Sequence, residues 1–295
     1  MKFGNPEDII QMTPDWTGER FEDGRPKVPD DIIRRMEKVT TEEAWAVLWN
    51  RGYKYNFEGG WVQLNPGRIL VGRAVTATFV PRRPDLHEAL MKHGHEKEGR
   101  IGEMNSWVIE TLREDDCIVI NLFGKVWEGT FSGGNLATAI ATRTKRGQVI
   151  HGGIRDAQQM LKIKNLVTFC RGMDPTPIRD TTMIGMNTPC QIGGAICMPG
   201  DVVLGTYSGI TFIPPHLAQE VVEDSERTRL RDIFGLQRLT EKKYTSHQMD
   251  SKWTPDVDED FAEWRKTHKL EDLEKIDWSK ETDLERRNRS EETRL

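Results

Sequence analysis

Two glycine pairs lie close together in the middle of this sequence, each beside residues that could bind an anion or a metal ion. The first is in the segment Ser132–Leu136 (SGGNL), and the second is in His151–Asp156 (HGGIRD). Glycine lets the backbone approach a ligand closely, and the free N–H groups at the start of a helix attract carboxylates. Arg155 can hold a carboxylate through two parallel hydrogen bonds, and Asp156 can hold a hard divalent cation.

Each motif alone has a plainer explanation: a tight turn for the first, and a surface ion pair with a helix cap for the second. Considered together they are more informative, because only one helix and one strand fit into the roughly 20 residues between them. That spacing can return both glycine pairs to the same edge of a sheet. A glycine-lined anion nest, an arginine and a metal-binding carboxylate would then suit a small 2-oxo acid, whose ketone the metal polarises.

The elements next to the glycine pairs predict how they are positioned. A helix candidate, Leu136–Arg146, has basic residues in its last turn and stops at Gly147. A short strand, Gln148–His151, follows and is broken by the second glycine pair. Asp156 can then cap a helix over Ala157–Lys164.

The rest of the middle region has the sequence pattern of a mixed α/β fold. Helical spacing predicts a helix over Met104–Leu112, and a final helix is expected after Pro214 and Pro215. Apolar runs predict strands over Arg68–Val80, Cys117–Phe123, Leu166–Cys170, Cys190–Ile192, Ala195–Met198, Val202–Leu204 and Ile210–Ile213. Because helices come first and a strand-rich half follows, an ordinary doubly wound nucleotide-binding fold is disfavoured.

Composition predicts three zones. Residues 1–37 form an N-terminal arm rich in Pro, Gly and charge, residues 38–225 carry the strands and glycine turns, and residues 226–295 are dominated by charge. The tail contains the tryptophans Trp253, Trp264 and Trp278. A disordered tail seldom carries such aromatics, so helices that dock on the core or on a neighbouring subunit are expected.

Overall composition excludes several function classes. The chain has 295 residues, 36% of them hydrophobic, a formal charge of −5 and a pI near 5.9, which argues against a general nucleic-acid or membrane-surface binder. No segment approaches the ~20 apolar residues of a membrane span, and the N-terminus lacks a signal-like apolar stretch, so a cytoplasmic protein is expected. The four cysteines lie in apolar runs without metal-type spacing, which predicts buried thiols.

The order of these motifs resembles the RraA-like family, the relatives of regulator of ribonuclease activity A. This family includes the 4-hydroxy-4-methyl-2-oxoglutarate and 4-carboxy-4-hydroxy-2-oxoadipate aldolases. The resemblance covers about Thr40 to Glu223, and its most specific part is the block GGNLATAIATRTKRGQVIHGGIRDAQQM. Supporting segments are Ile69–Val80, Phe169–Pro177 and Pro199–Val222.

The resemblance implies a compact layered α/β sandwich (β/β/α, swivelling type) with helical extensions at both ends. It implies a class II, divalent-metal-dependent pyruvate aldolase or oxo-acid lyase with Mg²⁺ or Mn²⁺, assembled as a homotrimer or hexamer with sites at subunit interfaces. Arg155 and Asp156 correspond to the catalytic pair that binds pyruvate and metal. The substrate carboxylate would be gripped by the backbone of Gly133, Gly134, Asn135, Leu136 and Ala137.

Two departures from the family pattern bear on the reaction. An acidic residue usually stands where this chain has Asn135, and an acidic run usually precedes the glycine of the segment 205–209, which here reads GTYSG. The leading hypothesis is retro-aldol cleavage of a 4-hydroxy-2-oxo acid, or decarboxylation of a 2-oxo acid, through a pyruvate enolate. The alternatives are a non-catalytic ring that binds another protein, and the same enolate chemistry on a sugar-derived acid.

Other polar residues have weaker claims. His87, His93 and His95 lie within a strongly charged run, which favours an exposed helix end over a metal cluster. Trp127 and Glu128 precede the first glycine pair and could line the substrate, with an aromatic core anchor as the alternative for the tryptophan.

Overall fold

The computed structural model describes residues 3–270, which divide into two compact units, one ending at Asp224 and the other beginning at Ser225. Its helices are α1 (Pro6–Met12), α2 (Asp30–Met36), α3 (Thr41–Asn50), α4 (Pro84–Lys97), α5 (Met104–Ile109), α6 (Gly134–Thr144), α7 (Ala157–Met160), the 3₁₀ turn η1 (Pro215–Leu217), α8 (Ala218–Thr240), α9 (Ser246–Asp250) and α10 (Pro255–Trp264). Its strands are β1 (Phe57–Glu58), β2 (Val62–Leu64), β3 (Leu70–Pro81), β4 (Asp116–Asn121), β5 (Gly147–Ile154), β6 (Val167–Met173), β7 (Thr181–Met186), β8 (Cys190–Ile192), β9 (Ala195–Cys197), β10 (Val202–Gly205) and β11 (Ile210–Ile213).

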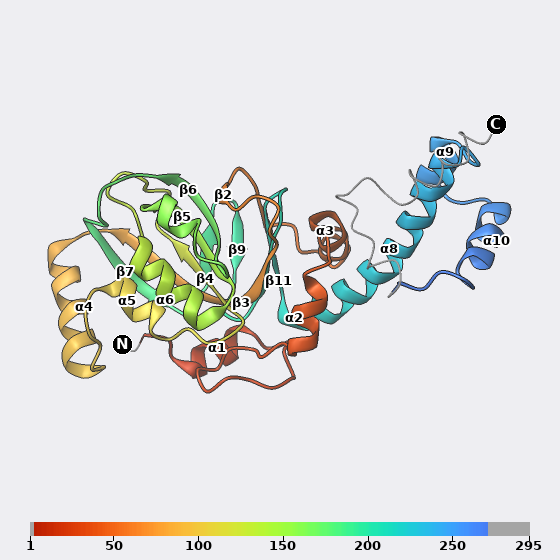
Figure 1. The fold of residues 1–295 in the computed structure, drawn as a ribbon. Coiled ribbons are helices and arrows are strands. Elements are labelled where there is room, and N and C mark those ends of the chain that lie inside the picture. Colours follow the sequence, from red (N-terminus) through yellow and green to blue (C-terminus); the bar gives the residue numbers. More distant parts are fainter. Residues whose placement is uncertain (1–2, 271–295) are drawn as a thin grey trace. The chain divides into compact units, whose positions relative to one another are not determined.

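The first unit is built on one large mixed sheet with the strand order β1-β11-β10-β3-β4-β5-β6-β2, together with β7, which also pairs with β3 (Figure 1). The pairs β3–β4, β4–β5 and β5–β6 are parallel, whereas the other pairs in this sheet are antiparallel. The carboxyl ends of the four parallel strands therefore meet at one edge, where α/β sheets commonly bind ligands.

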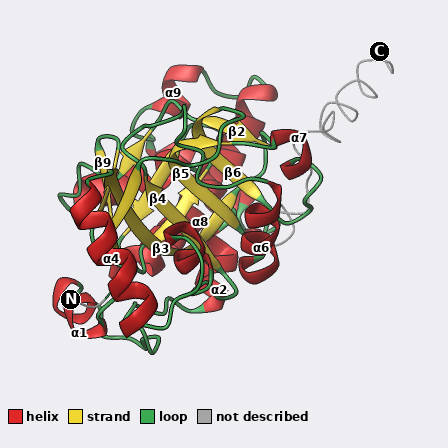
Figure 2. Ribbon diagram, turned by 90° about the vertical axis from the view of Figure 1, so that its left-hand side faces the viewer, coloured by secondary structure: helices red, strands yellow, loops and turns green. Residues whose placement is uncertain are grey.

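Both faces of this sheet are covered, which gives the layers seen in Figures 1 and 2. On one face, Val75, Ala77 and Phe79 of β3 join the apolar side of α5 and α6 in a single buried cluster. On the other face, Leu70 and Ala74 pack into a second cluster with the small hairpin β8–β9. Alternation along β3 thus supplies side chains to both layers.

Helix α6 forms because small and apolar residues recur on one side of it, and it buries Ala137, Ile140 and Ala141. The helix ends at Thr144, and the left-handed backbone of the following Lys145 (φ 58°) terminates the regular hydrogen bonding. Its first residue is Gly134, so its positive end lies beside the first glycine pair.

The segment before α2 reaches deep into the sheet. Arg25 is fully buried, and its guanidinium binds both carboxylate oxygens of Asp116 at 2.8 and 3.1 Å, and Asp23 at 2.9 Å. Two charges taken out of water are tolerated only when they are paired in this manner. Residues 3–37 are therefore part of the first unit, packed against its sheet rather than extended away from it.

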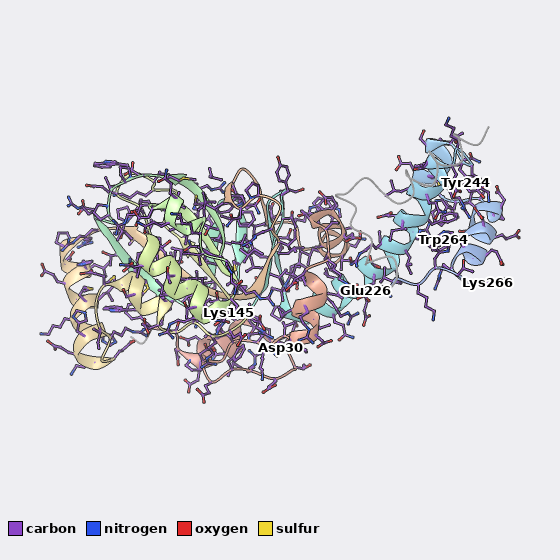
Figure 3. All side chains as sticks on the ribbon, viewed as in Figure 1. Asp30, Lys145, Glu226, Tyr244, Trp264 and Lys266 are labelled. Atoms are coloured by element: carbon purple, nitrogen blue, oxygen red, sulfur yellow. The ribbon has the colours of Figure 1, made fainter. Side chains whose placement is uncertain are left out.

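The second unit has its own small core. Phe234 of α8 packs against Trp253 and Trp264, with ring centroids 5.3 and 5.6 Å away, and the indole N–H of Trp264 donates to Gln237 Oε1 at 2.9 Å. Figure 3 labels Trp264 and Tyr244 in this unit. The tail therefore contains packed helices as far as Trp264, whereas Trp278 lies outside the described residues.

The predicted mixed α/β class with helical segments at both ends is confirmed. Strand β5 corrects one prediction, because it continues through Gly152 and Gly153 to Ile154, with a register shift against β6. Helix α7 is shorter than predicted and ends at Met160. All four cysteines are buried and free, as predicted. Within residues 3–270, no helix is both long and apolar enough to cross a lipid bilayer.

Candidate active site

The structure brings the two glycine pairs together at the carboxyl edge of the parallel strands. The segment before α6 runs beside the end of β5, where Phe131 N–H donates to Gly153 O at 2.9 Å and Arg155 N–H donates to Ser132 O at 3.1 Å. These two bonds fix Arg155 and Asp156 next to the start of α6.

Asp156 is held in an unusual backbone conformation. It has φ 58° and ψ 35°, the left-handed region, which Asp and Asn tolerate better than most residues. Its side chain does not cap α7, which corrects the sequence-based prediction. Instead Asp156 Oδ2 accepts the N–H of Gly134 at 3.0 Å, so the carboxylate sits at the positive end of α6.

The two glycines of the first pair differ in how closely their neighbours approach them. A Cβ on Gly133 would lie 2.5 Å from Asp156 Oδ2 and 3.0 Å from Arg155 Nε. A Cβ on Gly134 would lie 2.0 Å from Gln159 Oε1, the tip of an exposed side chain. The absence of a side chain at Gly133 is therefore what lets both charged groups reach the start of the helix.

Several donors at this point remain available to an anion. Of the first-turn N–H groups of α6, that of Gly134 is bound by Asp156 and that of Ala137 by Gly133 O at 2.9 Å. Those of Asn135 and Leu136 have no acceptor within the described part of the chain. The exposed guanidinium of Arg155 likewise has no ion pair or hydrogen bond to residues 3–270. A carboxylate placed here would meet two free N–H groups and an arginine.

Two buried side-chain hydrogen bonds stabilise the turn before α6. Ser132 Oγ donates to Gln148 Oε1 at 2.9 Å, and Gln148 Nε2 donates to Thr168 Oγ1 at 3.0 Å. All three residues are fully or nearly fully buried, so these bonds satisfy groups that would otherwise be costly to desolvate. These hydrogen bonds were not predicted from the sequence. The usable signal was that Ser132, Gln148 and Thr168 are each a polar residue next to apolar ones.

Metal binding would depend mainly on Asp156. Among the described residues, no three His, Cys, Asp or Glu side chains gather as a ready-made metal cage. Mg²⁺ nevertheless often binds through one or two carboxylates and keeps its remaining positions for water and substrate oxygens. One exposed carboxylate beside a helix end whose N–H groups at Asn135 and Leu136 have no acceptor in the described residues fits that requirement.

Comparison with known proteins decides the family. Residues 47–212, more than half of the chain, match the family described as RraA-like (Aldolase/RraA). The chain belongs to the RraA-like family. This family includes both oxo-acid aldolases and non-catalytic ribonuclease inhibitors.

Three relatives illustrate the family's range. Protein DlpA of Legionella pneumophila is 27% identical over 184 residues, which are 59% of this chain and 27% of that protein. The "Putative 4-hydroxy-4-methyl-2-oxoglutarate aldolase" of Halalkalibacterium halodurans is 31% identical over 86 residues, 29% of this chain and 40% of that protein. This chain therefore spans well under half the length of these two relatives. The structure of Streptomyces coelicolor RraAS2, an unusual member of the RNase ES inhibitor RraA family, has a TM-score of 0.59 and 23% identity, over 73% of this chain and 98% of that one, and supports the fold.

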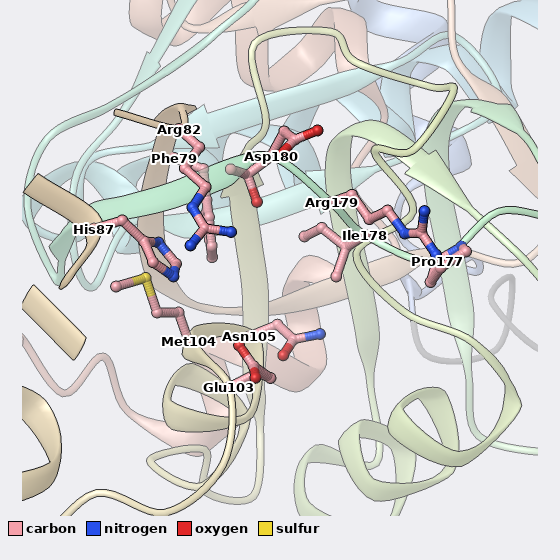
Figure 4. A pocket seen from close by; sticks show the side chains of 11 residues that line it. Phe79, Arg82, His87, Glu103, Met104, Asn105, Pro177, Ile178, Arg179 and Asp180 are labelled. Carbon is pink, nitrogen blue, oxygen red and sulfur yellow. The ribbon is translucent and has the colours of Figure 1, made fainter. Parts of the chain in front are cut away.

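A larger pocket lies at the same sheet edge, where β3 ends (Figure 4). Its volume is about 610 Å³, and its polar lining comprises Arg82, His87, Glu103, Asn105, Arg179, Asp180 and Thr181. The segment before the first glycine pair separates this pocket from the glycine turn and contacts residues of the pocket. Asn105 Nδ2 donates to Phe131 O at 3.1 Å, and Arg179 N–H donates to Glu128 O at 2.8 Å. Sequence reasoning missed this pocket because β7, which carries one wall, was not predicted.

The three histidines of α4 have separate environments. His87 lies 3.0 Å from Thr182 Oγ1 and lines the larger pocket, and burial, assisted by Arg82, lowers its pKa. His93 pairs with Glu98 at 3.2 Å, and His95 contacts Gly102 O at 3.1 Å. Each histidine thus has its own partner, and only His87 faces the pocket.

Trp127 and Glu128 are also placed by the structure. The alternative of an aromatic core anchor is wrong, because Trp127 is 65% exposed. Glu128 has φ 50°, and its carboxylate lies 3.8 Å from Arg179 in the wall between the glycine turn and the larger pocket. His151 lies half-buried beside Trp61, and its pKa is lowered by burial and by Arg171.

Proposed function

We propose that this protein is a metal-dependent lyase that cleaves a 4-hydroxy-2-oxo acid, or decarboxylates a 2-oxo acid, to release pyruvate. The observation that carries the proposal is the meeting of Arg155, Asp156 and two unpaired N–H groups of α6 around Gly133. Membership of a family that includes such aldolases supports it.

In this proposal the N–H groups of Asn135 and Leu136 bind the carboxylate of the substrate. Arg155 binds an oxygen on which negative charge develops, and a preorganised donor is most valuable there because it need not reorient during the reaction. In retro-aldol cleavage the C3–C4 bond breaks, the C4 hydroxyl loses its proton, and the electron pair leaves on the pyruvate enolate, which a proton then converts into pyruvate.

Asp156 would hold the divalent ion, Mg²⁺ or Mn²⁺, which when bound acts as a Lewis acid toward the 2-oxo group. Its carboxylate is already oriented by Gly134 N–H, and its left-handed backbone is fixed by the turn that precedes α7. We further propose a homotrimer or hexamer, with the exposed edge that bears Arg155 completed by a neighbouring subunit. A monomer in light scattering at micromolar concentration would contradict this assembly.

The test is pyruvate release from oxaloacetate and from a 4-hydroxy-2-oxo diacid, measured with a coupled dehydrogenase. We expect activity that is lost on exhaustive chelation and restored by Mg²⁺ or Mn²⁺. Arg155→Lys should lower turnover by roughly 10²–10³, because lysine keeps the charge but cannot offer two parallel donors. Asp156→Asn should be at least as damaging. Arg143→Lys, at the opposite end of α6, is the matched control and should remain active.

A non-catalytic protein-binding role is the second candidate, and Asn135 favours it. This residue is exposed at the start of α6, where family members usually carry an acid, so Asp156 is the carboxylate left at the turn. If both substrates are inert with either metal, and Arg155→Lys and Asp156→Asn melt much earlier than the wild type, the pair is structural. The lyase proposal is then wrong, and the binding role gains support.

A further inference from the structure

A second cavity lies under the N-terminal arm of the first unit, and it shares no residue with the site around Arg155. Residues 12–16 form one wall, the segment after α3 and the ends of β9 and β11 form the others, and the volume is about 160 Å³. We propose that this cavity is a binding site for a small organic ammonium ion. The residues that carry the argument are Asp15, Trp16, Tyr53, Asp201 and His216.

The walls of the cavity are held in place by hydrogen bonds. The guanidinium of Arg20 binds Thr13 Oγ1 and Thr13 O, each at 2.8 Å, and Trp16 O at 3.1 Å, which fixes the turn over residues 13–16. Opposite, Asn56 Nδ2 donates to Phe212 O at 2.8 Å and Phe212 N–H donates back to Asn56 O at 2.7 Å. The cavity is therefore a preformed space, which reduces the ordering cost of binding a ligand.

The charge in this space has one sign. Asp201 is 2% exposed, and it lines the cavity together with Asp15, whereas no lysine or arginine is among the lining residues. One oxygen of Asp201, Oδ2, accepts the N–H of Met198 at 2.7 Å and thereby closes the turn before β10. The other oxygen has no hydrogen bond to the described residues. A buried carboxylate without a counter-ion is costly, and a bound cation would compensate it.

Aromatic rings complete the environment. Trp16 and Tyr53 line the cavity, and the faces of such rings attract ammonium groups, the more strongly when water is excluded. The Tyr53 hydroxyl lies 3.2 Å from His216 Nε2, so these two groups satisfy each other. Two carboxylates and two aromatic rings around a space of this size favour an ammonium ion over a neutral or anionic ligand.

The protonation of the cavity is consistent with this ligand. Burial raises the pKa of Asp201 to about 7, and Tyr53 has a raised pKa because of burial and then because of Asp15 and Asp201. The other titratable groups that face Asp201 are His216 across the cavity and the buried thiol of Cys197. Since alkylammonium ions stay protonated at neutral pH, binding should strengthen as Asp201 ionises.

The volume sets the ligand class. At ~30 Å³ for each water molecule in the liquid, 160 Å³ holds about five waters, or a molecule of about four to six heavy atoms. Primary amines of three or four carbons fit this limit. For ligands of this size the attainable dissociation constants are roughly millimolar to tens of micromolar.

The experiment is a titration of the full chain with n-propylammonium chloride, followed by ligand-observed NMR, with n-propanol and propionate as neutral and anionic counterparts. We expect saturable binding of the amine alone, strengthening about tenfold from pH 6 to pH 8 as Asp201 ionises. Asp201→Asn should weaken binding at pH 8 by about tenfold or more and abolish the pH dependence.

Two further variants keep the test decisive if Asp201→Asn does not fold. Asp15→Asn changes an exposed residue and should weaken binding several-fold while retaining the pH dependence. Asp8→Asn removes the same charge from α1 outside the cavity and should bind as the wild type does. Equal binding of propanol, a flat pH profile in the wild type, or equal losses in the Asp15 and Asp8 variants would each overturn the proposal.

Discussion

Gly133→Ala is the substitution that best isolates the geometry of the proposed active site. Gly133 has φ −117° and ψ −169°, an extended conformation that alanine adopts freely, so the backbone is not strained. The new Cβ would lie 2.5 Å from Asp156 Oδ2. Ordinary contact needs about 3.5 Å, so the carboxylate must retreat by about 1 Å.

We expect this retreat to affect catalysis far more than stability. A displacement of ~1 Å at a reacting group typically costs on the order of 10² in rate. Loss of the bond from Gly134 N–H to Asp156 should cost about 1 kcal/mol, which lowers the melting temperature of a domain of this size by about 2–4 °C.

The assay combines pyruvate release on the better substrate, Mn²⁺ affinity by calorimetry, and the melting temperature. Gly134→Ala is the matched control, because its Cβ meets the tip of the exposed Gln159 side chain, which can swing away. Turnover of Gly133→Ala within about twofold of the wild type, with unchanged Mn²⁺ affinity, would refute the assignment of Asp156 and Arg155.

Three further outcomes follow from buried groups. Arg25→Met leaves Asp116 buried and unpaired, so urea denaturation should show a loss of about 3–5 kcal/mol in unfolding free energy. Burial raises the pKa of Cys170 and Cys190 to about 11, so a thiol reagent at pH 8 should label these two sites only after denaturation. The folded pKa of Asp201, about 7, is above its unfolded value, so its ionisation opposes folding: its contribution to stability falls as pH rises from about 4 to 7. Asp201→Asn should remove that fall, about 4 kcal/mol over three pKa units, in denaturation curves compared at pH 4 and pH 8.

Strong periodic signals made much of the central sheet predictable. The β-branched run of β3, the apolar run of β4 and the small apolar residues of α6 each determine an element locally, and the structure has all three. The juxtaposition of the two glycine pairs was also predictable, because one helix and one parallel strand return the chain to the same edge. The assignment of Arg155 and Asp156 to catalysis stays a prediction.

The incorrect predictions concern features that depend on contacts between residues distant in the sequence. Strand β5 continues through its glycines because Thr130 and Phe131 pair with Gly153, an interaction that a local pattern does not contain. The sequence predicts Asp156 as a helix cap, yet its carboxylate accepts the N–H of Gly134, 22 residues earlier, instead of an N–H of α7. Strand β7 was missed because it begins directly after a polar loop and owes its position to pairing with the end of β3.

The left-handed backbone at position 156 restricts which residues this turn can carry. Asp, Asn and Gly are the residues that adopt this conformation at little cost, whereas a β-branched or bulky side chain is disfavoured there. Asp can become Asn or Gly by a single-base change in its codon, so the carboxylate can disappear while the turn and the start of α6 persist. In a family that contains both aldolases and inhibitors, this fold can therefore lose the carboxylate that we propose binds the metal and keep the surface that surrounds it.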